Sequence, residues 1–224
     1  MIRVTTRGAH AGWGWGVWLG VAVGGAIGSI LRLAADTAVP APWDLVLVNA
    51  LGAVALLVLV LAVWPRRPGA PRWLRDGIGT GVIGAFTTLS GISIAIAVAT
   101  PVPVIADPGT FLAAAAAGTL GTLIRHAAAI SSARLRVSLG ILIVNVLGSF
   151  LAGLALAALA RGAIEPSTAI IVVAGGCGGL TTFSTIVADA VRGWPRGDRW
   201  LAALVLAANL GLGALAAWWG AVIL

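Results

Sequence analysis

The chain has 224 residues, of which 60% are hydrophobic and only 9% are charged, and its mean hydropathy is +1.06. Soluble domains carry about 25% charged residues, so this composition excludes an ordinary soluble enzyme or a nucleic-acid-binding module. The net charge of +7 results from 14 basic residues, all of them arginine, and seven acidic residues. In a chain this apolar we interpret the charge as a signal of membrane topology.

Seven apolar stretches follow one another along the chain, separated by breaks rich in Pro, Asp and Arg. Each exceeds the ~20 residues that a membrane-spanning helix needs. The expected spans are residues 12–35, 43–64, 77–100, 109–131, 137–160, 167–191 and 200–224. The first span lacks a convincing cleavage site, so we interpret it as a spanning helix and not as a cleaved signal.

The arginines between the spans indicate an orientation. With the N-terminus in the cytoplasm, eleven arginines fall in inside segments and only Arg161 falls in an outside segment. Four of the seven acidic residues also fall outside. The positive-inside rule therefore predicts a multi-pass protein of the cell membrane, with its N-terminus in the cytoplasm and its C-terminus outside.

Three short motifs occur twice in the same order, at offsets of 93, 96 and 94 residues. The pairs are Gly25–Arg32 with Gly118–Arg125, Val48–Gly52 with Val144–Gly148, and Gly84–Ser90 with Gly178–Ser184. Three matches at a nearly constant offset indicate a tandem duplication.

The duplication predicts a first repeat of three spans at 1–100, a linker at 101–108 and a second repeat of four spans at 109–224. An odd number of spans before the second copy inverts it in the membrane. The expected fold class is therefore all-α and integral to the membrane, with seven transmembrane helices in two inverted-topology repeats (3 + 4). Such repeats build many transport proteins, with the site near the midplane between them.

Asparagines recur at membrane depth in both copies, at Asn49 and Asn145. Polar groups in this position are costly and usually functional or paired. A helix–helix hydrogen bond, worth about 0.6 kcal/mol in membranes, is the alternative to a functional role. The symmetric placement favours function, above all for Asn145.

Hydroxyl side chains follow glycines in the middle of the third and sixth spans. The segments are Thr87-Thr88-Leu89-Ser90 and Thr181-Thr182-Phe183-Ser184. This composition predicts that the third helix of each repeat is broken, so that freed backbone carbonyls can hold a cation. Hydrogen bonds from Ser or Thr to their own helix are the alternative explanation.

The remaining polar residues in the spans allow two interpretations each. Arg32 and Arg125 lie near span ends, where they either snorkel to the interface or attract an anion at a vestibule. Asn209 in the last span either lines a pore or packs between helices. No Cys/His cluster indicates a metal site, Cys177 has the setting of a small buried thiol, and no hydrolase motif occurs, so we do not expect an enzyme.

The repeated motifs resemble those of the Fluc/CrcB fluoride channels, over nearly the whole chain and in two copies. The most specific is Gly-Gly-Leu-Thr-Thr-Phe-Ser at 178–184. Members are usually four-helix subunits that pair antiparallel, and this chain resembles a fused form. The resemblance implies passive fluoride export through up to two pores, and a central structural Na⁺ on backbone carbonyls. Those carbonyls would belong to Gly84, Thr87, Gly178 and Thr181.

The resemblance also implies an anion path. The family's pore asparagine matches Asn49 and Asn145, and its first pore phenylalanine matches Phe183 in the second repeat but Leu89 in the first. Its second phenylalanine is replaced by isoleucine in both repeats, at Ile92 and Ile186. The residues implied for the pore are Asn145, Phe183, Thr182, Ser184, Asn209 and Asn49, with Arg32 and Arg125 in the vestibules.

Only one family phenylalanine remains and the fourth helix has no counterpart in the first repeat, so we expect at most one working pore, on the Asn145 side. The function expected is a passive fluoride-selective channel. The alternatives are a small-solute carrier of the same inverted fold and a non-conducting membrane scaffold. The expected partners are fluoride and membrane lipid but no nucleic acid, and a single chain should suffice as a pseudo-dimer.

Overall fold

The computed structural model describes residues 14–98, 107–133, 138–193, 197 and 199–224, and every regular element within these ranges is a helix. The first pass is α1 (Trp15–Ala38). The second pass joins α2 (Trp43–Val58), the π-helical η3 (Leu59–Val63) and α3 (Trp64–Arg66). The third joins α4 (Arg72–Asp76), the π-helical η4 (Gly77–Ile83), α5 (Gly84–Phe86) and, beyond a break, α6 (Leu89–Ala97).

The second half of the chain repeats this series and adds one helix. It contains α7 (Pro108–Ser131), α8 (Leu139–Ala160), then α9 (Pro166–Ile170), the π-helical η5 (Ile171–Cys177) and α10 (Gly178–Leu180). Beyond a second break follow α11 (Ser184–Gly193) and α12 (Arg199–Ile223). The expected spans are thus confirmed to within a few residues, while most of the linker expected at 101–108 lies outside the described residues.

Six of the seven passes are long and apolar enough to cross a membrane. The exception, α7, is as long as α1 but contains more Thr and Ala, together with Arg125 and His126. It packs in the bundle against α1, α8 and η5. The protein is therefore an all-α integral membrane protein whose fourth pass, α7, is supported by its packing more than by its composition.

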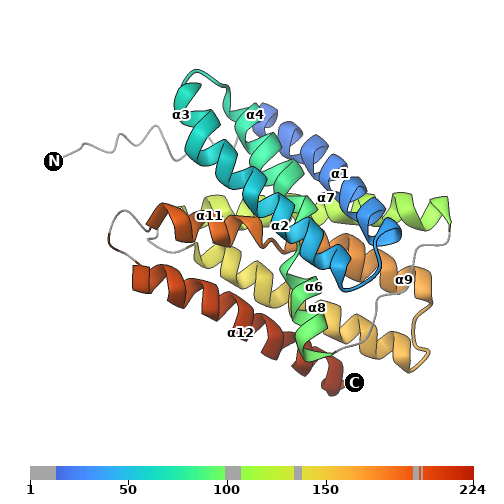
Figure 1. Ribbon diagram of the computed structural model, residues 1–224. Coiled ribbons are helices and arrows are strands. Elements are labelled where there is room, and N and C mark those ends of the chain that lie inside the picture. The colour runs from blue at the N-terminus through green and yellow to red at the C-terminus, as the bar shows by residue number, and fades with distance from the viewer. Residues whose placement is uncertain (1–13, 99–106, 134–137, 194–196, 198) are drawn as a thin grey trace.

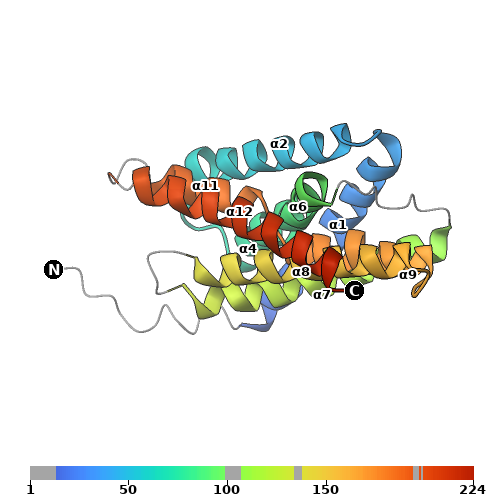
Figure 2. The same cartoon turned by 90° about the horizontal axis from the view of Figure 1, so that it is seen from below.

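Equivalent helices of the two repeats run in opposite directions. Figure 1 shows α1 and α7 antiparallel, and likewise α2 and α8. The start of α1 and the end of α12 lie at opposite ends of the bundle. The half-helix beyond each break packs against helices of the other repeat. The first-repeat α6 packs against α8 and α12, and the second-repeat α11 packs against α2 (Figure 2). This is the arrangement that an inverted duplication predicts.

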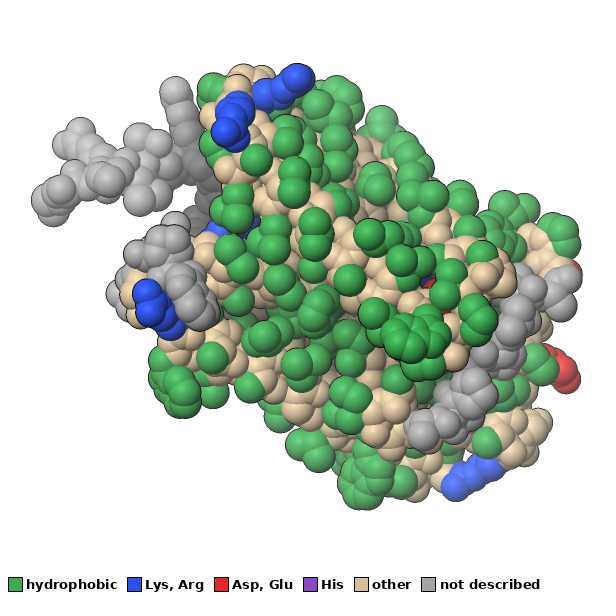
Figure 3. Space-filling model, in the orientation of Figure 1, with side chains coloured by type: hydrophobic (Ala, Val, Ile, Leu, Met, Phe, Trp, Pro, Cys, Tyr) green, Lys and Arg blue, Asp and Glu red, His purple; other side chains and the backbone are tan. Residues whose placement is uncertain are grey.

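The outer surface is largely apolar, and charged side chains gather at the two ends (Figure 3). Leu19, Val54 and Leu215, for example, each expose more than half of their surface. A soluble protein rarely exposes so continuous an apolar surface. The surface is that of a protein surrounded by lipid.

Small residues allow α1 and α7 to cross closely at the centre. A Cβ atom on Gly118 would lie 2.3 Å from Ser29 Oγ, and one on Gly25 would lie 3.1 Å from Thr122 Cβ. These two contacts are equivalent under the repeat, since Gly25 matches Gly118 and Ser29 matches Thr122. Small residues at such crossings are typical of membrane helices.

The N-terminal end of α7 is fixed by an N-cap. Asp107 accepts hydrogen bonds from the hydroxyl of Thr110 at 2.6 Å and from its backbone N–H at 2.8 Å. These bonds hold the pKa of the Asp107 carboxyl below its ordinary value, the hydroxyl contributing most. The cap satisfies donors that a helix start otherwise leaves unpaired.

Candidate functional site

Both breaks interrupt their helices at a threonine with extended backbone. Thr87 has φ −93° and ψ 152°, and Thr181 has φ −93° and ψ 159°. A seven-residue π-helical segment precedes each break by one short turn. Local π-helix is rare and is found mostly at functional positions. The broken third helix of each repeat is therefore confirmed.

Six hydroxyl side chains from the two breaks meet in the middle of the bundle, and we call them the central hydroxyl cluster. They are Thr87, Thr88, Ser90, Thr181, Thr182 and Ser184, none more than 5% exposed. The Oγ1 atom of Thr87 is 3.0 Å from Ser184 Oγ and 3.2 Å from Thr182 Oγ1. By symmetry, Thr181 Oγ1 is 3.0 Å from Ser90 Oγ and 3.2 Å from Thr88 Oγ1. The breaks therefore hydrogen-bond to each other across the repeats.

The same two threonines cap the half-helices of the opposite repeat. The backbone N–H of Ser184 donates to Thr87 Oγ1 at 3.3 Å. The backbone N–H groups of Leu89 and Ser90 donate to Thr181 Oγ1 at 3.2 and 3.1 Å. Unpaired N–H groups at a helix start are especially costly away from water. Each break is thus completed by the other repeat.

The predicted asparagines fix the breaks in the same way in both repeats. Asn49 Oδ1 accepts a hydrogen bond from the backbone N–H of Thr88 at 2.9 Å, and Asn145 Oδ1 accepts one from Thr182 at 2.9 Å. Both asparagines are buried. Their amide oxygens are therefore occupied by the breaks, which leaves only their amide N–H groups for other partners.

The amide nitrogens of the two asparagines have different partners. Asn145 Nδ2 donates to Asn209 Oδ1 of α12 at 2.7 Å and to the carbonyl of Thr182 at 3.3 Å. Asn49 Nδ2 only donates back to the carbonyl of Leu45 at 2.9 Å. Asn209 Nδ2 donates to Val205 O, and its second N–H has no partner among the described residues. The fourth helix therefore adds a polar group to one side of the molecule only.

Two serines that sequence reasoning missed extend this polar side. Ser93 of α6 and Ser149 of α8 are fully buried and lie 3.0 Å apart through their Oγ atoms. A Cβ atom on Gly213 of α12 would lie 2.8 Å from Ser93 Oγ, so α12 covers the pair. The position of Ser149, one turn after Asn145, was the signal that could have found it. We call Asn145, Asn209, Ser93 and Ser149 the polar column.

The other side of the molecule has no equivalent column. At the same offsets, Ser149 corresponds to Ala53 and Ser93 corresponds to Val187. Phe183 packs against the buried cluster of Leu89, Ile141 and Ile186, against which Leu206 and Leu210 of α12 also pack. The structure thus brings the predicted residues of the second repeat together beside α12.

Arg32 and Arg125 lie inside the bundle, each 1% exposed. Arg32 Nη1 donates to the carbonyl of Ala85 at 2.9 Å, and its Nη2 donates to Ala174 O of the opposite repeat. Arg125 Nε donates to Gly179 O at 3.1 Å, and its Nη2 donates to Thr80 O of the first repeat at 3.0 Å. The interpretation that they snorkel is therefore wrong for both, and the vestibule role stays a prediction.

The four acceptors are equivalent under the repeat. Ala85 corresponds to Gly179 and Thr80 to Ala174, each at an offset of 94 residues. Each arginine thus joins the break of its own repeat to the π-helical segment of the other. The sequence did not predict these bonds, because every residue has a backbone carbonyl and the side chain gives no sign of which carbonyl accepts.

The carbonyls expected to hold a cation lie at the same level as these arginines. Backbone carbonyls are suitable ligands for a monovalent cation, and Gly84 O accepts a 3.5 Å hydrogen bond from Thr87 Oγ1. A Cβ atom on Gly84 would, however, lie 2.4 Å from Arg125 Nη1, and one on Gly178 would lie 2.5 Å from Arg32. Neither guanidinium has an ion pair within the described residues. The donor chemistry fits Na⁺, but the adjacent positive charge favours an anion, so the Na⁺ site stays a prediction.

Comparison with known proteins was made with the whole chain. The model of the family described as CrcB-like protein, Camphor Resistance (CrcB), matches residues 19–100 and 112–221. The "Fluoride-specific ion channel FluC 2" of Thermobifida fusca is 40% identical over 120 residues, which are 51% of this chain and 86% of that relative. The protein of the same name from Haloarcula marismortui is 41% identical over 95 residues, 42% of this chain and 76% of that relative.

A third relative matches over a shorter stretch. The "Fluoride-specific ion channel FluC" of Erythrobacter litoralis is 38% identical over 88 residues, 35% of this chain and 65% of its own length. The relatives are therefore much shorter than this chain, as expected if it contains two copies of their sequence. No solved structure matches the chain.

Proposed function

This chain belongs to the CrcB family, and on that basis we propose that it is a fluoride-selective ion channel through which fluoride leaves the cytoplasm passively. Its relatives bear the name of fluoride-specific ion channels, which are transport proteins and not enzymes. We propose further that it resides in the cell membrane with its N-terminus in the cytoplasm, as the arginine distribution predicts.

The observation that carries the proposal is the polar column beside α12. An anion in a membrane must exchange its water shell for protein donors, because an unpaired buried charge is strongly disfavoured. The column contains amide N–H and hydroxyl groups, which are hydrogen-bond donors. Ser149 Oγ donates to Ser93 Oγ and Ser93 Oγ donates to Leu89 O, so an anion would take the place of these acceptors. The spare N–H of Asn209 faces no other acceptor in the described residues. These groups are suited to a small, strongly hydrated anion.

The surroundings of the column add favourable electrostatics. Two buried guanidinium groups lie close to the breaks and have no carboxylate in contact within the described residues. At low dielectric their positive charge lowers the energy of a nearby anion. The positive ring edge of Phe183 supplies a weaker contribution of the same sign.

We infer a single pore in a single chain. The first-repeat side lacks a fourth helix, and its residues in place of the two serines are Ala53 and Val187. Leu57 also stands at the position that corresponds to Gly153, where α8 accepts α12 at close range. A fourth helix from another chain therefore has no matching surface on α2.

We also propose a structural Na⁺ between the breaks, on the carbonyls of Gly84, Thr87, Gly178 and Thr181. The support is the extended backbone of both threonines, which takes these carbonyls out of regular helix bonding. The cation would hold the two breaks together, and the anion would be bound by the side chains of the polar column.

Fluoride efflux from liposomes tests the function. Purified chain is reconstituted into liposomes loaded with potassium fluoride, and release is followed with a fluoride electrode after a potassium ionophore is added. A channel releases fluoride rapidly, driven by voltage and without a coupled ion. A requirement for a counter-ion would indicate a carrier, and no release would indicate a scaffold. Replacing all Na⁺ by N-methylglucamine should abolish release if the central cation is needed.

A further inference from the structure

We propose that an anionic phospholipid binds at the end of the bundle where α3 and α4 meet. Its headgroup lies on Arg67 and Arg72, and its two acyl chains occupy two apolar grooves on either side of α4 and η4. This site lies on the outer surface, away from the central hydroxyl cluster. It does not depend on the ion that the protein conducts.

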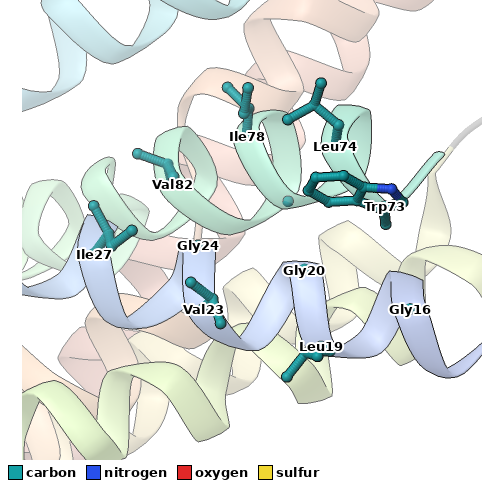
Figure 4. A pocket seen from close by; sticks show the side chains of 11 residues that line it. Gly16, Leu19, Gly20, Val23, Gly24, Ile27, Trp73, Leu74, Ile78 and Val82 are labelled. Atoms are coloured by element: carbon teal, nitrogen blue, oxygen red, sulfur yellow. The ribbon is translucent and has the colours of Figure 1, made fainter. Parts of the chain in front are cut away.

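The first groove runs between α1 and the α4–η4 segment and has a volume of about 490 Å³. Figure 4 shows Gly20 and Gly24 of α1 facing the neighbouring helix and the ring of Trp73 at the Gly16 end. Gly20 packs against the backbone of Trp73, where a Cβ atom would lie 2.5 Å from the Trp73 carbonyl oxygen, and the absence of a side chain at Gly16 leaves this end of the groove open. From Gly16 to Ile27 it follows eleven residues of helix, about 16 Å at 1.5 Å per residue. That length equals about half the ~30 Å hydrocarbon thickness, which is one leaflet.

The second groove lies on the other side of the same segment and has a volume of about 580 Å³. It is lined by Leu59 and Val63 of η3 and reaches Arg67. Leu74 and Ile78 line both grooves. These two side chains therefore form a ridge, and a lipid with two chains can straddle it.

The arginines at this end are divided between bound and free side chains. Arg66 donates to Ala62 O at 2.6 Å, and Arg75 donates to Arg67 O at 2.8 Å and lies over the Trp64 ring. The side chains of Arg67 and Arg72 are exposed, and neither has a hydrogen bond or ion pair to the described residues. Free guanidinium groups bind phosphate strongly, often through two parallel hydrogen bonds.

The charge at this end is complementary to an anionic headgroup. Four arginines and a single acid, Asp76, occur between residues 66 and 76. Figure 3 shows basic side chains at this end, whereas acidic and basic side chains both occur at the opposite end. Basic pockets between membrane helices on the cytoplasmic side are a known binding mode for anionic lipids. An anionic diacyl lipid is the ligand that combines a phosphate with two chains of leaflet length.

Native mass spectrometry of the full chain in detergent tests the site. Phosphatidylglycerol and phosphatidylcholine with the same acyl chains are titrated, and the fraction of lipid-bound protein is measured. We expect wild-type protein to retain phosphatidylglycerol preferentially. The double variant R67Q/R72Q should bind it about tenfold more weakly or worse, whereas R161Q, at the opposite end, should bind it normally.

A second pair of variants tests the first groove without changing the charge of the protein. Gly16→Leu places a side chain in the first groove, and its nearest neighbour, Trp73 Cβ, is 4.0 Å away, so the backbone need not move. Gly211→Leu on α12 also meets nothing within 4 Å and lies outside the grooves. We expect Gly16→Leu to reduce phosphatidylglycerol retention and Gly211→Leu to leave it unchanged.

Three outcomes would overturn the proposal. The first is equal retention of phosphatidylglycerol and phosphatidylcholine by the wild type. The second is an equal loss of phosphatidylglycerol binding in R161Q and R67Q/R72Q. The third is displacement of the lipid by millimolar inorganic phosphate, which would indicate a site for a free anion. Lipid retention is measured without fluoride, so the result is independent of the channel assay.

Discussion

Asn49 and Asn145 form the same hydrogen bond to the break of their repeat, which makes a matched comparison feasible. Replacing either by Leu leaves one buried backbone N–H unpaired, at a cost of about 1–3 kcal/mol. Asn145→Leu also removes the donor to Asn209 Oδ1, so it should be the more destabilising of the two. A difference in fluoride efflux at temperatures where both variants are folded then reports the path of the ion.

We expect Asn145→Leu to slow efflux at least about tenfold and Asn49→Leu to retain most of it, because only Asn145 belongs to the polar column. Asn145→Asp should slow it further, since it places a negative charge beside an anion. The measurement is the initial rate of efflux per reconstituted chain, with thermal stability in detergent as the control. Equal slowing by the two leucine variants would show that both sides conduct.

Arg32 combines two roles that substitution can separate. Arg32→Met removes the donors to Ala85 O and Ala174 O, and leaving these carbonyls unpaired should cost on the order of 2 kcal/mol. Arg32→Lys keeps the charge but not the planar pair of donors. We expect both variants to lower the midpoint of thermal unfolding.

The efflux of these two variants reports the charge. If the guanidinium stabilises the anion electrostatically, Arg32→Lys conducts clearly faster than Arg32→Met at comparable stability. Rates that are equal in the two variants would limit Arg32 to a structural role. The matched pair Arg125→Lys and Arg125→Met repeats the test in the other repeat.

At the scale of elements, the docking of α12 depends on glycine. A Cβ atom on Gly153 would lie 2.0 Å from the backbone oxygen of Ala217. Gly153→Leu must therefore push α12 away from α8 and break the 2.7 Å bond between Asn145 and Asn209. We expect efflux to be lost and the unfolding temperature to fall.

Gly211→Leu is the control for this substitution, since it adds the same side chain to α12 with no atom within 4 Å. It should conduct normally. Full efflux in Gly153→Leu would mean that the position of α12 does not matter for the ion path.

The elements differ in how far the sequence could predict them. Long apolar runs predicted all seven passes, because length and hydropathy suffice for a helix in lipid. The breaks followed from glycines beside hydroxyl residues. The π-helical segments η3, η4 and η5 were not predicted, because a shift from i→i+4 to i→i+5 bonding has no signature in composition.

The candidate site was predictable to the extent that its residues repeat. Asn49 and Asn145 were found because they recur, and so were the threonines of the breaks. Ser93 and Ser149 were missed because the other repeat has Val187 and Ala53 in their place. The arginines were found, but their burial depends on how two distant segments pack, which local sequence does not determine.

At the scale of the whole molecule, the inverted arrangement predicts that the two connecting loops next to Gly69 and Arg161 lie on opposite sides of the membrane. Single-cysteine reporters test this, because the native Cys177 is buried. Gly69→Cys meets no atom within 4 Å and should be tolerated. A membrane-impermeant maleimide added to intact cells should label Arg161→Cys and not Gly69→Cys.

The control for this experiment is permeabilised cells, in which both variants should be labelled. Labelling of both in intact cells would place the two loops on the same side. The repeats would then be parallel, and the account of the central hydroxyl cluster would be wrong.

The mutual capping of the breaks has a consequence for biogenesis. Thr181 is synthesised 94 residues after Thr87, a delay of about 5–20 s at typical rates of translation. Throughout that interval the N–H groups of Leu89 and Ser90 have no Thr181 hydroxyl to receive them. The first half of the protein therefore matures only when the second half has been inserted by the translocon. A truncated nascent chain would remain a substrate for quality control, whatever the stability of its individual helices.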